Sequence, residues 1–182
     1  RAKLFAAVHD LEPARALLCD PALREERRLV LGGGSNLLFT RDFDGLVLQV
    51  ATRGLGVVRE DETCVWLRAA AGEPWDAVVE WSTARGLGGL ENLSGIPGLA
   101  GAAPIQNIGA YGAELADVGD TVETLSMDGG EPAALPASAC QFGYRDSLFK
   151  RAERGRHLVT AVVLRLQKTP VLRLDYGDLR ST

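Results

Sequence analysis

The residues best suited to chemistry gather in three segments, and the first is a run of glycines after a predicted strand. Gly32, Gly33 and Gly34 are followed directly by Ser35 and Asn36. Consecutive backbone N–H groups in such a turn can form a nest that binds an anion, and the hydroxyl and amide side chains suit a pyrophosphate. No Walker A lysine follows, and the last glycine of GxGxxG is missing. Taken alone, the segment favours a plain tight turn over a phosphate site.

The second segment, residues 91–112, is dominated by glycine, alanine and other small residues. Backbone with small side chains can lie against a large flat ligand, and isoleucines at 96, 105 and 108 can supply apolar contacts to a ring system. The amides of Gln106 and Asn107 can supply donors and acceptors to the same ligand. The alternative is a mobile glycine-rich loop, which would place these apolar residues poorly in solvent.

The third segment, residues 142–150, holds an arginine between a tyrosine and an aspartate, with aromatic residues on both sides. Arg145 in this setting can be held rigidly and only partly solvated. A guanidinium offers planar, forked donors to a carboxylate and keeps its charge. On local grounds, a surface arginine paired with Asp146 is an equally good interpretation.

Alternating helix and strand patterns predict the elements that position these segments. The first part of the chain reads as strand, helix, strand, strand, with Asp10 capping the helix and Pro13 in its first turn. The predicted elements are a strand at 3–8, a helix from 10 to about 19, and strands at 28–31 and 45–50.

The second part opens with a predicted hairpin, 55–59 and 64–70, followed by a helix that begins at 72–74 with proline in its first turn and ends at Gly86. A long loop at 87–112 follows, and loops of this length are usually functional. Strands are expected at 118–127 and 158–166, with a turn at 128–130 after the first of them. The stretch after Lys168 resembles a connection that leads elsewhere.

Composition narrows the classes of partner. The net charge is −4, whereas nucleic-acid binding needs a basic face. No apolar run approaches the roughly 20 residues of a membrane helix, and no signal peptide is visible. Cys19, Cys64 and Cys140 are widely spaced, which favours reduced structural thiols and a cytoplasmic location over disulfides or a zinc site. We therefore expect no nucleic acid, no membrane and no metal.

Taken together, the three segments resemble the UDP-N-acetylenolpyruvoylglucosamine reductases. Residues 32–36 are similar to that family's GxGSN turn, 96–112 to its IPGxxGAxPxQNxGAYG loop, 144–150 to its YRDSxFK segment and 176–179 to its YGDL motif. The long loop and the YRDS segment are each highly specific, and the similarity covers essentially the whole chain.

The resemblance implies an α+β, two-lobed FAD-binding fold of the vanillyl-alcohol oxidase type, with FAD between the lobes. It also implies that NADPH reduces FAD, and that flavin N5 then gives hydride to UDP-N-acetylglucosamine enolpyruvate, making UDP-N-acetylmuramate for peptidoglycan. Arg145 would stabilise charge building towards the substrate carboxylate, with Tyr144 and Tyr176 on the substrate side. FAD-binding residues are expected at Gly32, Gly33, Gly34, Ser35, Asn36, Ile96, Pro97, Gly101, Ala102, Ala103, Ile105, Gly109 and Tyr111.

The sequence departs from the family in what it lacks. The family's proton-donor serine follows a glycine and precedes a phenylalanine; Ser181 and Ser147 lack this context, and no glutamate follows Glu153. We therefore expect a fragment: a first FAD-binding lobe at 1–53, a second at 54–168, and at 169–182 the start of a connection to a substrate-binding domain. The alternatives are a non-catalytic flavin- or nucleotide-binding module, and another oxidase of the same fold, which Tyr144, Arg145 and Tyr176 disfavour.

Overall fold

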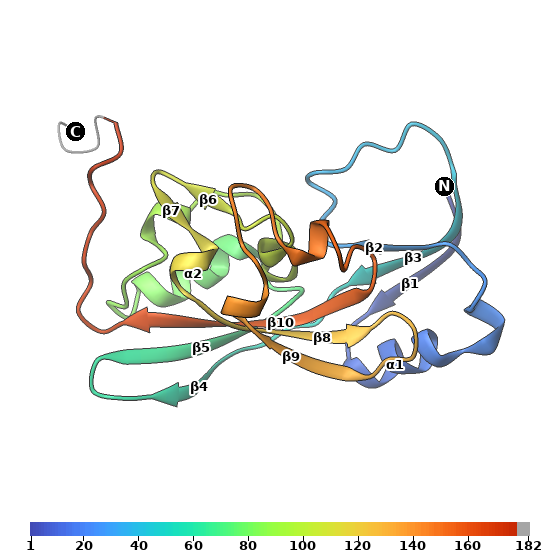
Figure 1. Cartoon of the computed structure of the whole chain (residues 1–182), viewed down its shortest axis with the longest axis horizontal. Helices are drawn as coiled ribbons and strands as arrows, with labels where there is room; N and C mark the ends of the chain where they lie inside the picture. The colour runs from blue at the N-terminus through green and yellow to red at the C-terminus, as the bar shows by residue number, and fades with distance from the viewer. Residues whose placement is uncertain (178–182) are drawn as a thin grey trace.

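Residues 1–177 are described by the computed structural model, which contains two larger β-sheets arranged along the long axis of the molecule (Figure 1). The first sheet is parallel, with the strand order β1-β3-β2. The chain passes from β1 to β2 through α1, because parallel strands require a crossover connection. Ala14 and Leu18 of this helix pack with residues of β3 in a small core. The elements are β1 (Ala2–Val8), α1 (Leu11–Cys19), the 3-10 helix η1 (Pro21–Leu23), β2 (Arg28–Leu31) and β3 (Phe43–Val50).

The second sheet is antiparallel, with the strand order β4-β5-β10-β8-β9. Its central strand, β10, has 11 residues and is buried along most of its length. A separate two-stranded ribbon, β6-β7, lies above it (Figure 1). The strands are β4 (Leu55–Glu60), β5 (Cys64–Ala70), β6 (Gly109–Ala110), β7 (Ala113–Glu114), β8 (Gly119–Ser126), β9 (Pro132–Pro136) and β10 (His157–Gln167).

Helix α2 (Trp75–Thr83) and the long loop cover one face of the second sheet. The indole of Trp75 is 1% exposed, and its Nε1 donates to the carbonyl of Leu93 at 3.0 Å, so the helix holds the loop as well as the sheet. Short 3-10 helices shape the remaining connections: η2 (Glu91–Leu93), η3 (Ala100–Ile105), η4 (Leu115–Asp117), η5 (Ala137–Ala139) and η6 (Leu148–Lys150).

The two sheets meet through shared core residues rather than through a linker alone. Leu125, Met127 and Leu158 of the second sheet region pack in the core that α1 forms with β3. The guanidinium of Arg28 at the start of β2 donates to the carbonyls of Met127 and Leu23. This packing fixes the end of β2, and therefore the glycine turn that follows it, against the second sheet.

Most predicted elements are present within two residues of their expected bounds, including the hairpin β4-β5. Three local expectations were wrong. Asp10 occupies the N-cap position of α1, but its side chain makes no capping hydrogen bond. Pro74 is the N-cap of α2 and not part of its first turn. The long loop is not free of secondary structure, because η2, η3 and β6 lie within it.

Besides the short strands β6 and β7, the strand β9 was not predicted from the sequence. It pairs with β8 across the turn at residues 128–130, where Gly130 adopts a φ of 70°. Proline at both ends of β9 argues against a strand, because proline cannot donate to a ladder. The strand is nevertheless possible here, because β9 lies at the edge of its sheet and one side needs no partner.

In residues 1–177, no helix has the length and apolar character needed to cross a membrane. The three cysteines are free thiols: Cys19 is exposed, Cys64 is half-buried and Cys140 is buried. Burial raises the pKa of the Cys140 thiol to about 11, so this group is neutral at physiological pH.

Candidate functional site

The glycine turn, residues 32–36, leaves the end of β2 with its backbone donors unused. Within residues 1–177, the N–H groups of residues 33–36 have no hydrogen-bond acceptor, and neither the Ser35 nor the Asn36 side chain has a partner. All five residues of the turn line a cavity of about 240 Å³, which we call the small cavity. The turn therefore presents unpaired donors to a hollow, as expected of an anion-binding nest.

No close contact within the protein requires Gly32 or Gly33 to lack a side chain. A Cβ on Gly33 would meet only Leu99 Cγ, at 3.8 Å, and a Cβ on Gly32 would come no closer than 3.5 Å to the same side chain. Gly101 differs, because its Cβ would lie 2.5 Å from Ala71 Cβ. Gly101 thus serves packing, whereas Gly32 and Gly33 leave room for something to approach the backbone closely.

The long loop, residues 87–112, forms the opposite wall of the small cavity and is fastened to α2. The Trp75 N–H donates to the Gly98 carbonyl at 3.0 Å, and the Asp76 carboxylate accepts from the Gly95 N–H and the Ser94 hydroxyl. These bonds, the one from Gly95 first, lower the pKa of Asp76. The loop is therefore a built structure and not a mobile linker.

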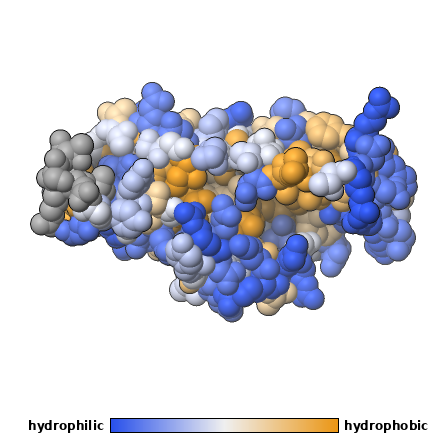
Figure 2. Space-filling view, turned by 90° about the horizontal axis from the view of Figure 1, so that it is seen from above, coloured by the Kyte–Doolittle hydropathy of each residue, from blue (hydrophilic) through white to orange (hydrophobic). Residues whose placement is uncertain are grey.

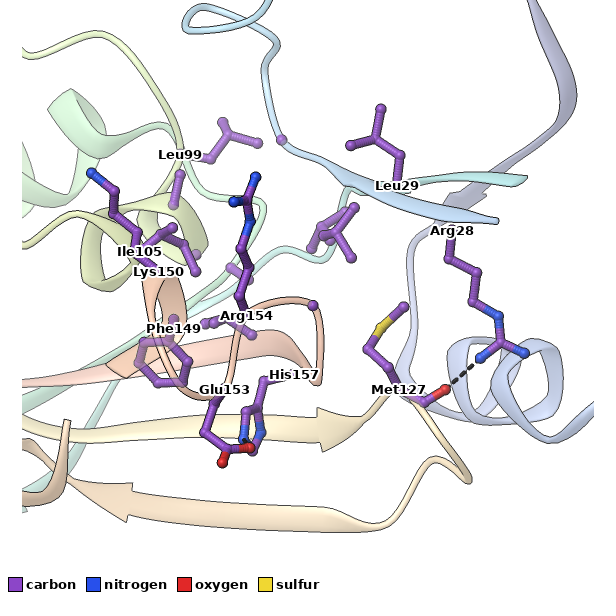
Figure 3. Close-up of a pocket in the computed structure, with 18 residues that line it drawn as sticks. Arg28, Leu29, Leu99, Ile105, Met127, Phe149, Lys150, Glu153, Arg154 and His157 are labelled. Carbon is purple, nitrogen blue, oxygen red and sulfur yellow. Dashed lines mark hydrogen bonds and ion pairs between the residues drawn. The ribbon is translucent and has the colours of Figure 1, made fainter. Parts of the chain in front are cut away.

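A second, larger hollow of about 610 Å³ continues from the small cavity, and we call it the large cavity. It lies between β2, the long loop and the segment that leads from η6 into β10 (Figure 3). The space-filling view shows apolar surface in a hollow along the middle of the molecule, bordered by hydrophilic residues (Figure 2). The two cavities share five lining residues: Val30, Gly32, Leu99, Ala102 and Ile105. Together they form one elongated cleft with the glycine turn at its junction.

Most of the predicted cofactor residues line this cleft. Gly101 lines the large cavity, and Gly32, Ala102 and Ile105 line both. The other lining residues face the small one: Gly33, Gly34, Ser35, Asn36, Ile96, Pro97 and Ala103. Gly109 and Tyr111 line neither cavity. Gly109 lies in β6, and Tyr111 is 54% exposed in the turn after it, with a φ of 48°.

Sequence reasoning missed most of the other residues that line the large cavity. Arg28 and Leu29 line it from β2, Lys150 and Arg154 from the segment before β10, and His157 from the first position of β10 (Figure 3). Within residues 1–177 the Arg154 side chain has no hydrogen-bond or ion-pair partner. Among these residues, only Lys150 belongs to a motif that the sequence analysis singled out, as the last residue of the YRDSxFK segment. The others look like ordinary strand and loop residues in the sequence.

Arg145 lies in a four-residue turn, Gly143 to Asp146, which we call the arginine turn. Arg145 itself has a φ of 53°. Its Nη2 donates to the Gly109 carbonyl at 2.6 Å, and Lys150 Nζ donates to the Arg145 carbonyl at 2.8 Å. Arg145 does not pair with Asp146, whose carboxylate instead pairs with Arg151 at 3.0 Å. Arg145 is held by backbone contacts, but it is exposed rather than only partly solvated.

The other two predicted substrate-side residues differ in their surroundings. Tyr176 packs edge-on against Tyr111, with ring centroids 6.0 Å apart. Tyr144 is 86% exposed. Asp178 and Leu179 of the YGDL motif, and Ser181, lie outside the described residues. Arg145 and Tyr176 thus both contact the end of the long loop, at Gly109 and Tyr111.

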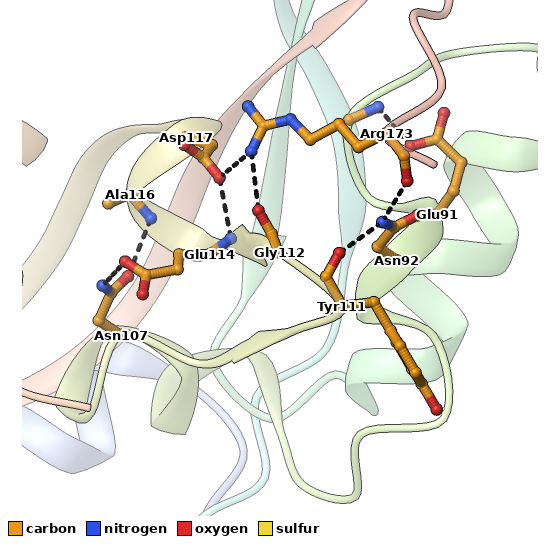
Figure 4. Close-up of polar contacts among 10 residues, drawn as sticks. Glu91, Asn92, Asn107, Tyr111, Gly112, Glu114, Ala116, Asp117 and Arg173 are labelled. Carbon is orange, nitrogen blue, oxygen red and sulfur yellow. Dashed lines mark hydrogen bonds and ion pairs between the residues drawn. The ribbon is translucent and has the colours of Figure 1, made fainter. Parts of the chain in front are cut away.

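The segment before Tyr176 is fastened to the same end of the loop (Figure 4). The Asn92 amide donates to the carbonyls of Tyr111 and Arg173, each at 2.9 Å. Arg173 Nη1 lies 2.5 Å from Asp117 Oδ2 and 3.4 Å from the Gly112 carbonyl. These contacts hold the chain after β10 beside Tyr111.

Asn107 was expected to offer its amide to a ligand, and this expectation was wrong. Its side chain is buried, and its polar atoms bond to Glu114 and to the Ala116 N–H (Figure 4). Its Nδ2 also donates to the Gly143 carbonyl. Gln106 does line the small cavity, as do Ile96, Ile105 and Ile108, the three isoleucines proposed for apolar contacts.

The family of this domain is decided by a match over most of the chain: the FAD binding domain family matches residues 2–130. The chain belongs to the FAD binding domain family. The predicted α+β fold is confirmed by this match and by solved structures. A UDP-N-acetylenolpyruvylglucosamine reductase from Thermus caldophilus aligns with a TM-score of 0.71 and 28% identity, over 89% of this chain and 55% of that one. A solvent-stable cholesterol oxidase, 12% identical with a TM-score of 0.64 over 90% of this chain and 34% of that one, shares the fold.

Curated relatives of this FAD binding domain carry the name that the motifs indicated. UDP-N-acetylenolpyruvoylglucosamine reductases from Burkholderia mallei (strain NCTC 10229) and Paraburkholderia phymatum are 48% and 49% identical to it over 179 residues, or 98% of this chain. The resemblance drawn from the three segments is therefore confirmed. The chain spans about half the length of these relatives, 52% in each case.

Proposed function

We propose that this chain is the FAD-binding part of a flavoenzyme that uses NADPH to reduce UDP-N-acetylglucosamine enolpyruvate to UDP-N-acetylmuramate, a step of peptidoglycan synthesis. The proposal follows the names of the relatives. The observation that carries it is the cleft itself: a nest of unpaired N–H groups stands at the junction of two hollows with apolar walls.

The residues of the cleft fit FAD. A dinucleotide needs donors for its diphosphate and flat apolar walls for its two ring systems. The glycine turn offers the donors without side chains in the way, and Ile96, Ile105 and Leu99 offer apolar surface on the two sides of it. When bound, FAD supplies hydride transfer from NADPH to a carbon–carbon double bond.

The chain's own residues would act by positioning and by charge. Arg145 would face the substrate carboxylate, where a fixed cation stabilises the negative charge that develops in the transition state. Its contacts with Gly109 and Lys150 would reduce the reorganisation needed when the substrate binds. Tyr176, Tyr144 and, at the end of the long loop, Tyr111 and Gly109 would lie near the same region.

The reaction also requires groups that these 182 residues do not contain. The sequence has no serine in a glycine-serine-phenylalanine context and no glutamate after Glu153. We infer lobes at 1–53 and 54–168, and a connection at 169–182 to a substrate-binding domain. A cytoplasmic location and the absence of nucleic-acid or membrane partners belong to the same proposal. The second candidate is a non-catalytic flavin-binding module, and it is favoured by the same missing groups.

Replacing Gly33 with leucine in the full-length gene product tests the cleft. The side chain has room in the protein but would occupy the space in front of the nest, so FAD affinity should fall by a factor of about 10 or more. The matched control is Gly56→Leu on β4, where a Cβ meets nothing within 4 Å and which lies outside both cavities. FAD titration by flavin fluorescence, with melting temperatures of both variants, gives the comparison. Equal FAD affinity in Gly33→Leu and Gly56→Leu would place the cofactor elsewhere.

A further inference from the structure

The arginine turn is fastened to the wall of the cleft at both of its ends. Gly143 and Asp146 exchange two backbone hydrogen bonds of 3.0 and 3.1 Å, which close the turn around Arg145. Before it, the Gly143 carbonyl accepts from Asn107 Nδ2 at 3.0 Å. After it, the fully buried Ser147 hydroxyl donates to the Ile105 carbonyl at 2.6 Å. The direction in which Arg145 points therefore depends on these two tethers.

Asn107 is the more informative tether, because its amide joins three separate segments. It is 1% exposed, its Nδ2 donates to Glu114 Oε2 at 2.7 Å as well as to Gly143, and its Oδ1 accepts from the Ala116 N–H at 2.9 Å. Two acceptors and one donor surround the amide, so only one orientation satisfies all three contacts.

Few side chains other than asparagine fit this position. Its φ of 45° is tolerated well only by glycine, asparagine and aspartate. Glycine has no side chain, and an aspartate carboxylate cannot donate to Gly143. The bonds to Glu114 and Ala116 hold Asn107 to the segment that follows it in sequence, and the bond to Gly143 is the one that reaches the arginine turn.

We propose that Asn107 is a positioning residue for Arg145, whose amide fixes the arginine turn so that the guanidinium meets the substrate carboxylate. The inference rests on the proposed reductase function and deepens it. Asn107 lines neither cavity, so its side chain would act on the reaction through the arginine turn and not by touching the ligand.

Two variants of the full-length gene product test this role. Asn107→Asp keeps the size and the acceptor for Ala116 but removes the donors to Gly143 and to Glu114, and it places a second carboxylate beside Glu114. Asn107→Gly removes the side chain at a φ that glycine adopts without strain. Both should slow substrate reduction by about tenfold or more and raise the KM for the enolpyruvyl substrate, with flavin reduction by NADPH changed by less than about twofold. The control is Glu114→Gln, which keeps an acceptor for Asn107 and leaves the Gly143 bond intact; it should behave as wild type.

Combining Asn107→Gly with Arg145→Ala separates positioning from general stability. If Asn107 acts through Arg145, its loss should have little further effect on substrate reduction once Arg145 is gone. Additive losses, or equal slowing of both half-reactions by Asn107→Gly and Asn107→Asp, would overturn the proposal and leave Asn107 a structural residue.

Hydrogen exchange gives a measurement that does not depend on activity. Amide exchange in a peptide that spans residues 141–148 should be faster in both Asn107 variants than in wild type and Glu114→Gln, and unchanged exchange would overturn the proposal. A wild-type protein without reductase activity would overturn the proposed function instead, while this exchange comparison would still report whether Asn107 holds the arginine turn.

Discussion

Replacing Arg145 with alanine in the full-length gene product should slow substrate reduction by a factor of about 10²–10³ and leave flavin reduction by NADPH nearly unchanged. Only the second half-reaction builds negative charge towards the substrate carboxylate. The structure adds a reason for a large effect, because Arg145 is already held by the Gly109 carbonyl and by Lys150. Stopped-flow records of flavin bleaching and reoxidation measure the two half-reactions separately.

Two further variants sharpen the Arg145 experiment. Arg145→Lys keeps the charge but not the planar fork, and it should recover part of the lost rate. Arg85→Ala removes an arginine that lies over the Trp81 ring at 4.0 Å, outside both cavities, and it should change neither half-reaction. If Arg145→Ala slows both half-reactions equally, Arg145 has a structural role and no part in stabilising the transition state.

The 182-residue chain alone should not turn over UDP-N-acetylglucosamine enolpyruvate at a useful rate. Its sequence contains no segment that resembles the family's proton-donor serine or assisting glutamate. Without a positioned donor, water must quench the species formed by hydride addition, and positioned proton transfer usually contributes about 10²–10⁴-fold. Loss of substrate contacts would also remove binding energy that orients the double bond.

The corresponding measurement is NADPH consumption that depends on the enolpyruvyl substrate, compared between this chain and the full-length gene product. The chain should still bind FAD, because the glycine turn and both cavities lie within it. Comparable turnover in the two proteins would show that no further segment is needed, and the fragment interpretation would be wrong.

The sequence predicted most of the fold because its local signals agree with the tertiary structure. Pro13 lies in the first turn of α1 and Pro74 lies directly before α2, and the runs of apolar residues located most of the strands. The sequence failed to predict β9, because its two prolines argue against a strand. Pairing with β8 at the edge of the sheet nevertheless stabilises it. The sheet order, and the packing of Met127 and Leu158 with residues of α1 and β3, depend on contacts distant in sequence and left no local signal.

The candidate site was predicted where it consists of contiguous motifs and missed where strands assemble it. The glycine turn and most of residues 96–105 face the same cleft. The rest of the large cavity's lining comes mainly from β2 and from the segment that leads into β10, whose residues appear ordinary in sequence. Asn107 shows the opposite error. Its place in a ligand-binding motif suggested that its amide contacts a ligand, but in the fold the amide bonds to the Gly143 carbonyl instead.

The central claim, that the cleft holds FAD, is tested most directly by the absorption spectrum of the purified full-length gene product. The account predicts a visible flavin spectrum as isolated or after incubation with FAD, and a released cofactor that chromatography identifies as FAD at one molecule per chain. A colourless protein that cannot be reconstituted with FAD would contradict it.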